Sequence, residues 1–121
     1  MSYDFGIWNR AATTKTAMVL DAWHAITQEH GHPAMGDFDA EAVLAEIAAL
    51  FPDEATDPDN PLTASSGRDA ETAWIVIHAP QSAVEHYTGI LMEVALSHGL
   101  MLWDPQRGAV WGNRRPPKLS A

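Results

Sequence analysis

The stretch that decides the fold is AWIVIHA, residues 73–79, which is the clearest strand in the chain. It is rich in branched and aromatic residues, which favour extended backbone. Successive side chains of a strand point to opposite faces of the sheet, so Trp74, Val76 and His78 should share one face. The fold is therefore expected to contain a sheet that includes this strand.

The elements on either side of this strand follow from hydrophobic periodicity and from helix and turn signals. In chain order we expect a strand at 3–8, a helix from Thr13 or Thr14 to about residue 30, a helix from Asp37 or Asp39 to Phe51, an edge strand at 61–66, a turn at 66–69, the strand at 73–79, a helix from Ser82 to His98, and strands at 100–104 and 109–112. Without the second helix and the last strand, the order is βαββαβ, the ferredoxin-like pattern. The sequence thus predicts an α+β fold, a ferredoxin-like βαββαβ sandwich with one inserted helix and a C-terminal hairpin strand. One domain should span residues 1–112, followed by a flexible tail at 113–121.

Two glycines have expected roles. In the segment DPQRG, residues 104–108, Gly108 should supply the positive φ that ends a turn. Asp104 is therefore expected to be structural. Gly89 lies within a predicted helix, where glycine costs about 1 kcal/mol relative to alanine, and we expect it to let another element approach.

Size and composition limit the class of protein. A chain of 121 residues with 46% hydrophobic and 19% charged residues suits one folded domain. The absence of cysteine excludes disulfide scaffolds, thiol catalysis and cysteine-based zinc sites. No segment has the ~20 apolar residues of a membrane span, and the first residues do not resemble a signal peptide. We therefore expect a cytoplasmic protein with no membrane contact.

The net charge of −9 is unevenly distributed. Eight acidic residues, and no lysine or arginine, lie between Asp37 and Asp59. An acidic surface repels phosphate groups, so nucleic-acid binding is disfavoured, whereas a basic protein partner would be attracted.

The large aromatic residues are expected on an uncovered face of the sheet. If the helices cover one face, alternation assigns to that face Phe5, Ile7, Ile75, Ile77, Leu100 and Leu102, and to the opposite face Trp8, Trp74, Val76, His78, Met101 and Trp103. Such an exposed apolar patch is typical of a binding or self-association surface. The alternative is that the second helix or the tail covers this face.

Patterns that would carry catalysis or bind metal have little support. Asp4 and His78 point to the same face, but parallel pairing of their strands would separate them by four residues, ~13 Å, which excludes a histidine–carboxylate dyad. His30 and His32 lack a third metal ligand. The sequence has no phosphate-binding glycine loop and no dinucleotide motif. We expect no metal, no cofactor and, on balance, no enzyme activity.

Three segments together resemble a family of small bacterial α+β proteins: YDFGIW at 3–8, ALFPD at 49–53 and HGLMLWDPQRGAVW at 98–111. The similarity spans nearly the whole chain and departs around residues 30–37 and 53–72. Some members of that family resemble immunity proteins that accompany secreted bacterial toxins. The resemblance therefore implies an α+β fold and a toxin-neutralising role.

The leading hypothesis is a non-enzymatic protein-binding domain, an immunity protein that neutralises a basic bacterial toxin through its acidic surface. The expected partner-binding residues are Asp37, Asp39, Glu41, Glu46, Asp57, Asp59, Trp8, Trp74, His78 and Trp103. One alternative is a small-molecule-binding or enzymatic domain that uses the open sheet face, for which a concave pocket lined by Trp8, Trp74, His78 and Trp103 would be the sign. Another alternative is a homodimer joined through that face.

Overall fold

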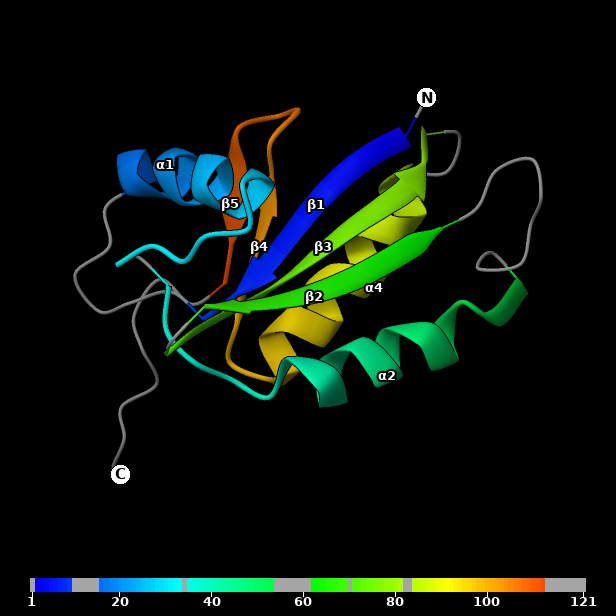
Figure 1. The fold of residues 1–121 in the computed structure, drawn as a ribbon. Helices are drawn as coiled ribbons and strands as arrows, with labels where there is room; N and C mark the ends of the chain where they lie inside the picture. Colours follow the sequence, from blue (N-terminus) through cyan, green and yellow to red (C-terminus); the bar gives the residue numbers. More distant parts are fainter. Residues whose placement is uncertain are drawn as a thin grey trace.

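The computed structural model describes residues 2–9, 16–33, 35–53, 62–69, 71–81 and 84–112. Its elements are β1 (Ser2–Trp8), α1 (Thr16–Thr27), α2 (Ala40–Leu50), β2 (Thr63–Asp69), β3 (Thr72–Pro80), α4 (Val84–Ser97), β4 (Met101–Asp104) and β5 (Ala109–Trp111) (Figure 1). This order of helices and strands is the expected one, and the α+β class is confirmed. The expected tail at 113–121 lies outside the described residues.

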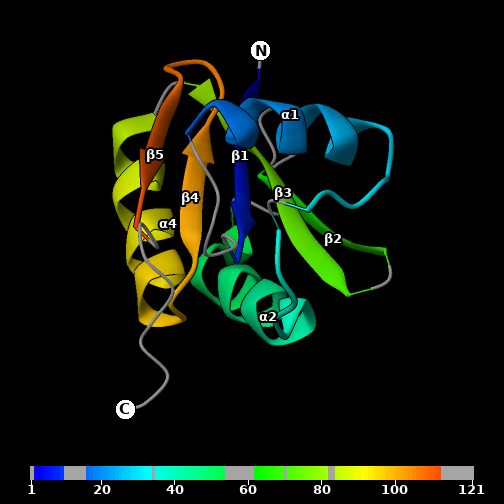
Figure 2. The same ribbon diagram turned by 90° about the vertical axis from the view of Figure 1, so that its left-hand side faces the viewer.

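The five strands form one sheet in the order β2-β3-β1-β4-β5, with every neighbouring pair antiparallel. β1 is the central strand, although it comes first in the sequence (Figure 2). The predicted parallel pairing of β1 with β3 is wrong. Because α2 returns the chain to the end of the sheet at which β1 begins, β2 runs in the same direction as β1, and the β2–β3 hairpin then reverses the chain.

The helices α2 and α4 cover one face of the sheet and enclose the larger apolar core (Figure 1). As alternation predicted, this core contains Phe5, Ile7, Ile75, Ile77 and Leu102 of the strands and Leu100, which directly precedes β4. The helices contribute Val43, Ile47, Tyr87, Leu91 and Val94. Full burial of one such side chain stabilises a fold by about 1.5–3 kcal/mol.

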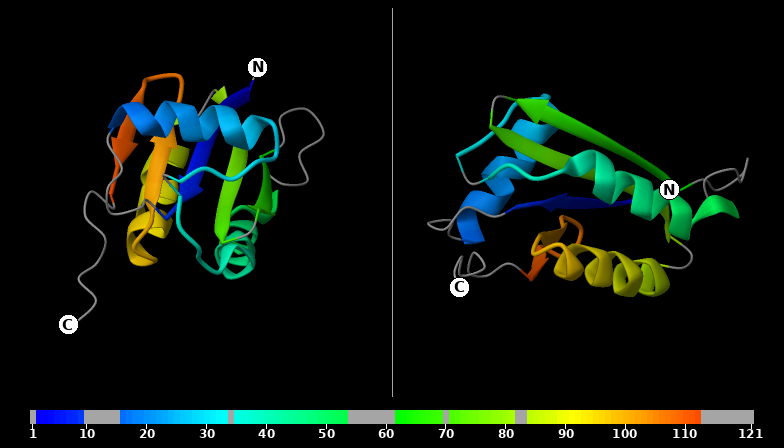
Figure 3. Two further views of the ribbon diagram at one scale, coloured as in Figure 1. Left: turned by 60° about the vertical axis from the view of Figure 1, so that its left-hand side comes forward. Right: turned by 90° about the horizontal axis from the view of Figure 1, so that it is seen from below.

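The helix α1 lies on the opposite face and runs across the strands (Figure 3). Its residues Val19, Ala22 and Ile26 pack into a second core with Met35, Trp8, Trp74, Met101 and Trp103. The prediction of an uncovered tryptophan face is therefore wrong: Trp8, Trp74 and Trp103 are only 0%, 5% and 5% exposed. The helix that covers them is α1, whereas α2 packs on the other side. The tryptophan face that the homodimer alternative requires is therefore covered by α1.

The ferredoxin-like arrangement is not confirmed at this level of detail. The sheet has five strands and helices on both faces, whereas the expected sandwich carries its helices on one face. None of the helices within the described residues is long and apolar enough to cross a membrane.

Some of the predicted helix caps, turns and glycine roles are confirmed and others are wrong. Asp39 begins α2 as its N-cap, and its side chain accepts a hydrogen bond from the amide of Ala42 at 3.1 Å. Gly108 has the expected positive φ of 63°. The expected turn at 66–69 is wrong, since these residues belong to β2. The expectation that Gly89 lets another element approach is wrong, because a Cβ there would meet nothing within 4 Å. The expected cap residues Thr13, Thr14 and Ser82 lie outside the described residues.

Candidate functional site

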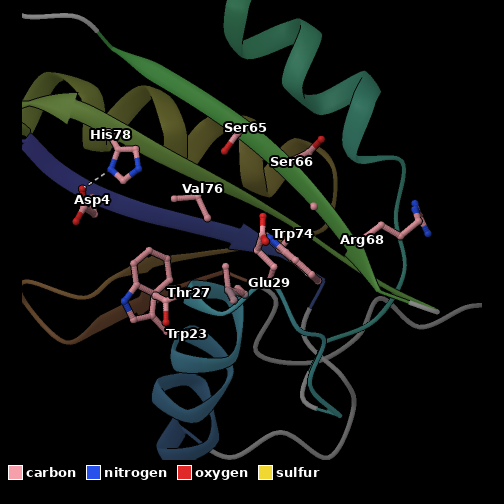
Figure 4. A pocket seen from close by; sticks show the side chains of 12 residues that line it. Asp4, Trp23, Thr27, Glu29, Ser65, Ser66, Arg68, Trp74, Val76 and His78 are labelled. Atoms are coloured by element: carbon pink, nitrogen blue, oxygen red, sulfur yellow. Dashed lines mark hydrogen bonds and ion pairs between the residues drawn. The ribbon is translucent and has the colours of Figure 1, made fainter.

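A groove of about 500 Å³ opens on the α1 side of the sheet, between the C-terminal end of α1 and the strands β2 and β3 (Figure 4). It exists because α1 crosses the sheet toward β3 and ends without covering β2 (Figure 3). The strands supply Asp4, Ser65, Gly67, Trp74, Val76 and His78 to its lining, and the end of α1 with the turn after it supplies Trp23, Ile26, Thr27 and Glu29.

The floor of the groove is the face of β3 that alternation assigns to Trp74, Val76 and His78. Trp74 is buried, Val76 is half-buried and His78 is exposed. The groove therefore has an apolar part and a polar end, and the two are arranged along a single strand (Figure 4).

The indole of Trp74 lies across the backbone of the edge strand β2. Gly67 is its direct partner in the β2–β3 ladder, and a Cβ at Gly67 would lie only 2.4 Å from Cε2 of Trp74. Glycine is thus required on β2 for the indole to occupy this position. Trp74 and Gly67 thus pack together at one end of the groove floor.

The polar end of the groove is a histidine–carboxylate pair. Asp4 and His78 are direct partners in the antiparallel β1–β3 ladder, and Nδ1 of His78 lies 2.6 Å from Oδ1 of Asp4. The prediction that these residues lie too far apart is wrong, and the cause is the wrong strand direction. If Nδ1 donates to Asp4, the other ring nitrogen, which points away from Asp4 (Figure 4), is an acceptor toward a bound molecule.

Glu29 reaches the groove from a backbone conformation that is rare for its residue type. Its φ of 61° is in the left-handed region, and no other described residue except glycine has a positive φ. The amide of Glu29 donates to Ile26 O at 2.8 Å, and that of His30 donates to Ala25 O at 3.0 Å. These two bonds form a Schellman motif, whose left-handed position is usually glycine.

Replacing Glu29 with glycine is expected to raise the free energy of unfolding by about 1 kcal/mol, because glycine removes the strain of a left-handed side-chain-bearing residue. Urea unfolding followed by circular dichroism measures this change. The control is Gln28→Gly at the preceding position, whose φ is not positive, and which should lose stability. A less stable Glu29→Gly variant would show that the glutamate makes a stabilising contact.

A second polar cluster lies around Asp104, on the α4 side of the sheet. The carboxylate is fully buried and accepts hydrogen bonds from the hydroxyl of Tyr3 at 2.8 Å, the amides of Gln106 and Arg107 at 3.0 and 3.1 Å, and Nε2 of Gln106 at 2.9 Å. Burial raises the pKa of the Tyr3 phenol, and the hydrogen bond and charge of Asp104 raise it further. Tyr3 therefore stays protonated as a donor to Asp104.

This cluster is structural and lies outside the groove. The side chain of Gln106 donates to the carbonyl of Asp4 at 2.8 Å and accepts from its amide at 2.7 Å, so it extends the β1–β4 ladder beyond the end of β4. Arg107 forms an ion pair with Glu85 and lies 5.9 Å from the Tyr3 ring centroid. Asp104 thus organises the turn, as the sequence predicted.

The predicted acidic surface is largely engaged in contacts within the protein. Asp37 binds Arg68 at 2.6 Å, Asp39 caps α2, and Glu46 binds His98 at 2.7 Å. Glu41 is exposed on α2. Asp57 and Asp59 lie outside the described residues.

The structure brings together only part of the predicted site. Trp74 and His78 line the groove, whereas Trp8 and Trp103 are buried beneath α1. Asp4, Trp23 and Glu29 were not among the expected site residues. Within the described part of the chain, no group of three or more histidine, aspartate and glutamate residues is placed to hold a metal ion.

The chain matches no protein-family model, no curated protein and no solved structure. The resemblance to a family with immunity-like members therefore stays a prediction, and the geometry of the groove carries the functional argument.

Proposed function

We propose that the protein is a small-molecule-binding domain whose site is the groove between α1 and the β2–β3 edge of the sheet. The observation that carries the proposal is a concavity of about 500 Å³ with an apolar floor and the Asp4–His78 pair at one end. Ligand pockets are typically ~300–1,000 Å³, mostly apolar, with a few polar groups that fix the orientation of the ligand. The groove has this size, and its lining combines Trp23, Ile26 and Val76 with polar side chains that can orient a ligand.

The strained backbone at Glu29 supports the same site. A non-glycine residue in the left-handed region costs about 1–3 kcal/mol, and such residues cluster where function requires a particular side chain. Glu29 is in this conformation at the rim of the groove.

The proposal predicts that small organic fragments bind the native protein at the groove and that Ser65→Trp blocks them. Ser65 is an exposed β2 residue that faces the groove (Figure 4), and an edge strand accepts tryptophan readily. The test is a mixed-charge fragment set that includes 2-phenylethylamine, 2-phenylethanol and 3-phenylpropionate, followed by amide chemical shifts. Fragments that bind the native protein should lose about tenfold or more in affinity, at least ~1.4 kcal/mol.

The matched control is Glu93→Trp, which adds the same side chain to an exposed position of α4 on the far face of the sheet. It should leave fragment binding unchanged. Chemical shifts that cluster away from the groove, or that persist in Ser65→Trp, would contradict the proposal, as would the absence of binding by the whole set.

A protein-binding role, with toxin neutralisation as its specific form, is the second proposal. The exposed acidic residues Glu41 and Glu46 on α2 support it, since such residues would attract a basic partner. That partner would have to compete with Arg68 for Asp37 and with His98 for Glu46. Because the groove requires no such competition, it has more support.

We also infer that α1 and β5 are additions to a βαββαβ sandwich. The strand order β2-β3-β1-β4 and the placement of α2 and α4 on one face support this inference.

A further inference from the structure

The charge around the groove is not balanced. Arg68, which lies at its rim, is committed elsewhere: Nη1 binds Asp37 at 2.6 Å and Nη2 donates to the carbonyl of Phe38 at 3.1 Å. Asp4 and His78 face each other, and Nδ1 of His78 lies 2.6 Å from Oδ1 of Asp4, so the carboxylate of Asp4 already has a partner. The positive groups of the lining therefore already have acidic partners.

Among the described residues of the lining, Glu29 is the carboxylate without such a partner. Its side chain is exposed and forms no hydrogen bond or ion pair with any residue in the described part of the chain, although it lines the groove (Figure 4). A negative charge in this position is held by a backbone conformation that would suit glycine better. The chain as a whole has a net charge of −9, which enriches cations and repels anions near its surface.

Part of the remaining lining is suited to a hydrocarbon group, beside the hydroxyl groups of Thr27, Ser65 and Ser66. Trp23 and Trp74 contribute indole rings, and Ile26 and Val76 contribute aliphatic surface. Trp23 is only half-buried, so part of its indole is accessible from the groove. A tryptophan face attracts an organic cation through the electrons of its ring, by about 0.5–1 kcal/mol at exposed sites.

We infer that the groove binds a small organic cation, an alkyl- or arylammonium compound, with its hydrocarbon part against Trp23 and Val76 and its ammonium group paired with Glu29. This inference rests on the proposed function, since it names the class of molecule that the groove takes. The negative charge of Glu29 disfavours carboxylate and phosphate ligands in the same place.

The test compares three probes of similar size and different charge: 2-phenylethylamine, 2-phenylethanol and 3-phenylpropionate. Each is titrated into the full chain at neutral pH and low salt, and binding is followed by the amide chemical shifts of groove residues. The ammonium compound should bind about tenfold more tightly than the carboxylate, a difference of ~1.4 kcal/mol. Glu29→Gln should reduce the affinity for 2-phenylethylamine several-fold and leave that for 2-phenylethanol unchanged.

The matched control is Glu93→Gln, which removes one negative charge from the exposed face of α4. If this variant reduces the affinity for 2-phenylethylamine as much as Glu29→Gln does, only the net charge of the protein matters and the inference is overturned. Equal affinity for the alcohol and the amine at the groove would also overturn it, while leaving the groove as a binding site. If no probe or other fragment shifts the groove residues, the proposed function itself fails.

Discussion

Replacing Asp104 with alanine should lower the free energy of unfolding by about 3–5 kcal/mol, because truncation of a buried, hydrogen-bonded carboxylate leaves its donors unpaired. These donors are the Tyr3 hydroxyl, the amides of Gln106 and Arg107 and the Gln106 side chain. Folded domains are stable by only about 5–15 kcal/mol, so the loss would be a large part of the total. Urea unfolding should show a lower midpoint with little change in slope.

Asp21→Ala is the control for this variant, since Asp21 is exposed on α1 and its loss should change stability by no more than about 0.5 kcal/mol. If Asp104→Ala costs less than about 1 kcal/mol, the donors find other partners and the cluster is not required for the turn.

The second large effect is expected from Gly6→Ala, which should cost about 1–3 kcal/mol through overpacking. A Cβ at Gly6 would lie 2.7 Å from Cζ3 of Trp8 and 3.0 Å from Cζ3 of Trp23. Trp8 is fully buried, whereas Trp23 is half-buried on α1, so we expect α1 with Trp23 to shift. Thermal or urea unfolding measures the loss, and the indole N–H signal of Trp23 reports the displacement.

Gly89→Ala is the control, and it should change the free energy of unfolding in the opposite direction. A Cβ there would meet nothing within 4 Å, and the residue is exposed within α4. Alanine in an exposed helix interior should therefore stabilise by about 0.5–1 kcal/mol. A Gly6→Ala variant as stable as the native protein would show that the two indole rings repack at no cost.

Alternation along the strands was predictable from the sequence. Phe5, Ile7 and Leu102 face α2 and α4, and Trp8 and Trp103 face the opposite side, as expected. The reason is that the period of two is a property of extended backbone and does not depend on tertiary contacts. The same pattern leaves open which helix covers each face.

The side on which α1 packs was missed, although β3 carried a signal. AWIVIHA is apolar at nearly every position, and such a continuous run is typical of a strand that is covered on both faces. The identity of the covering helix depends on how the chain after α1 is routed, and periodicity contains no information about that route.

The candidate site was harder to predict than the fold. The Asp4–His78 pair depends on the relative direction of two strands about 70 residues apart, which the hydrophobic pattern does not specify. Glu29 was missed because the helix was expected to continue to about residue 30, whereas Glu29 occupies the left-handed position at the end of α1. Only the backbone geometry identifies Glu29 as unusual.

The central position of β1 in the sheet affects how the protein can fold during its synthesis on the ribosome. β1 is synthesised before the other four strands, but its two ladder partners lie within residues 72–80 and 101–104. β1 therefore remains unpaired until the residues of β3 and β4 have been synthesised. Such dependence on distant partners slows folding and leaves sticky intermediates exposed, so nascent chains of this protein should depend on chaperones until residue 104 has emerged.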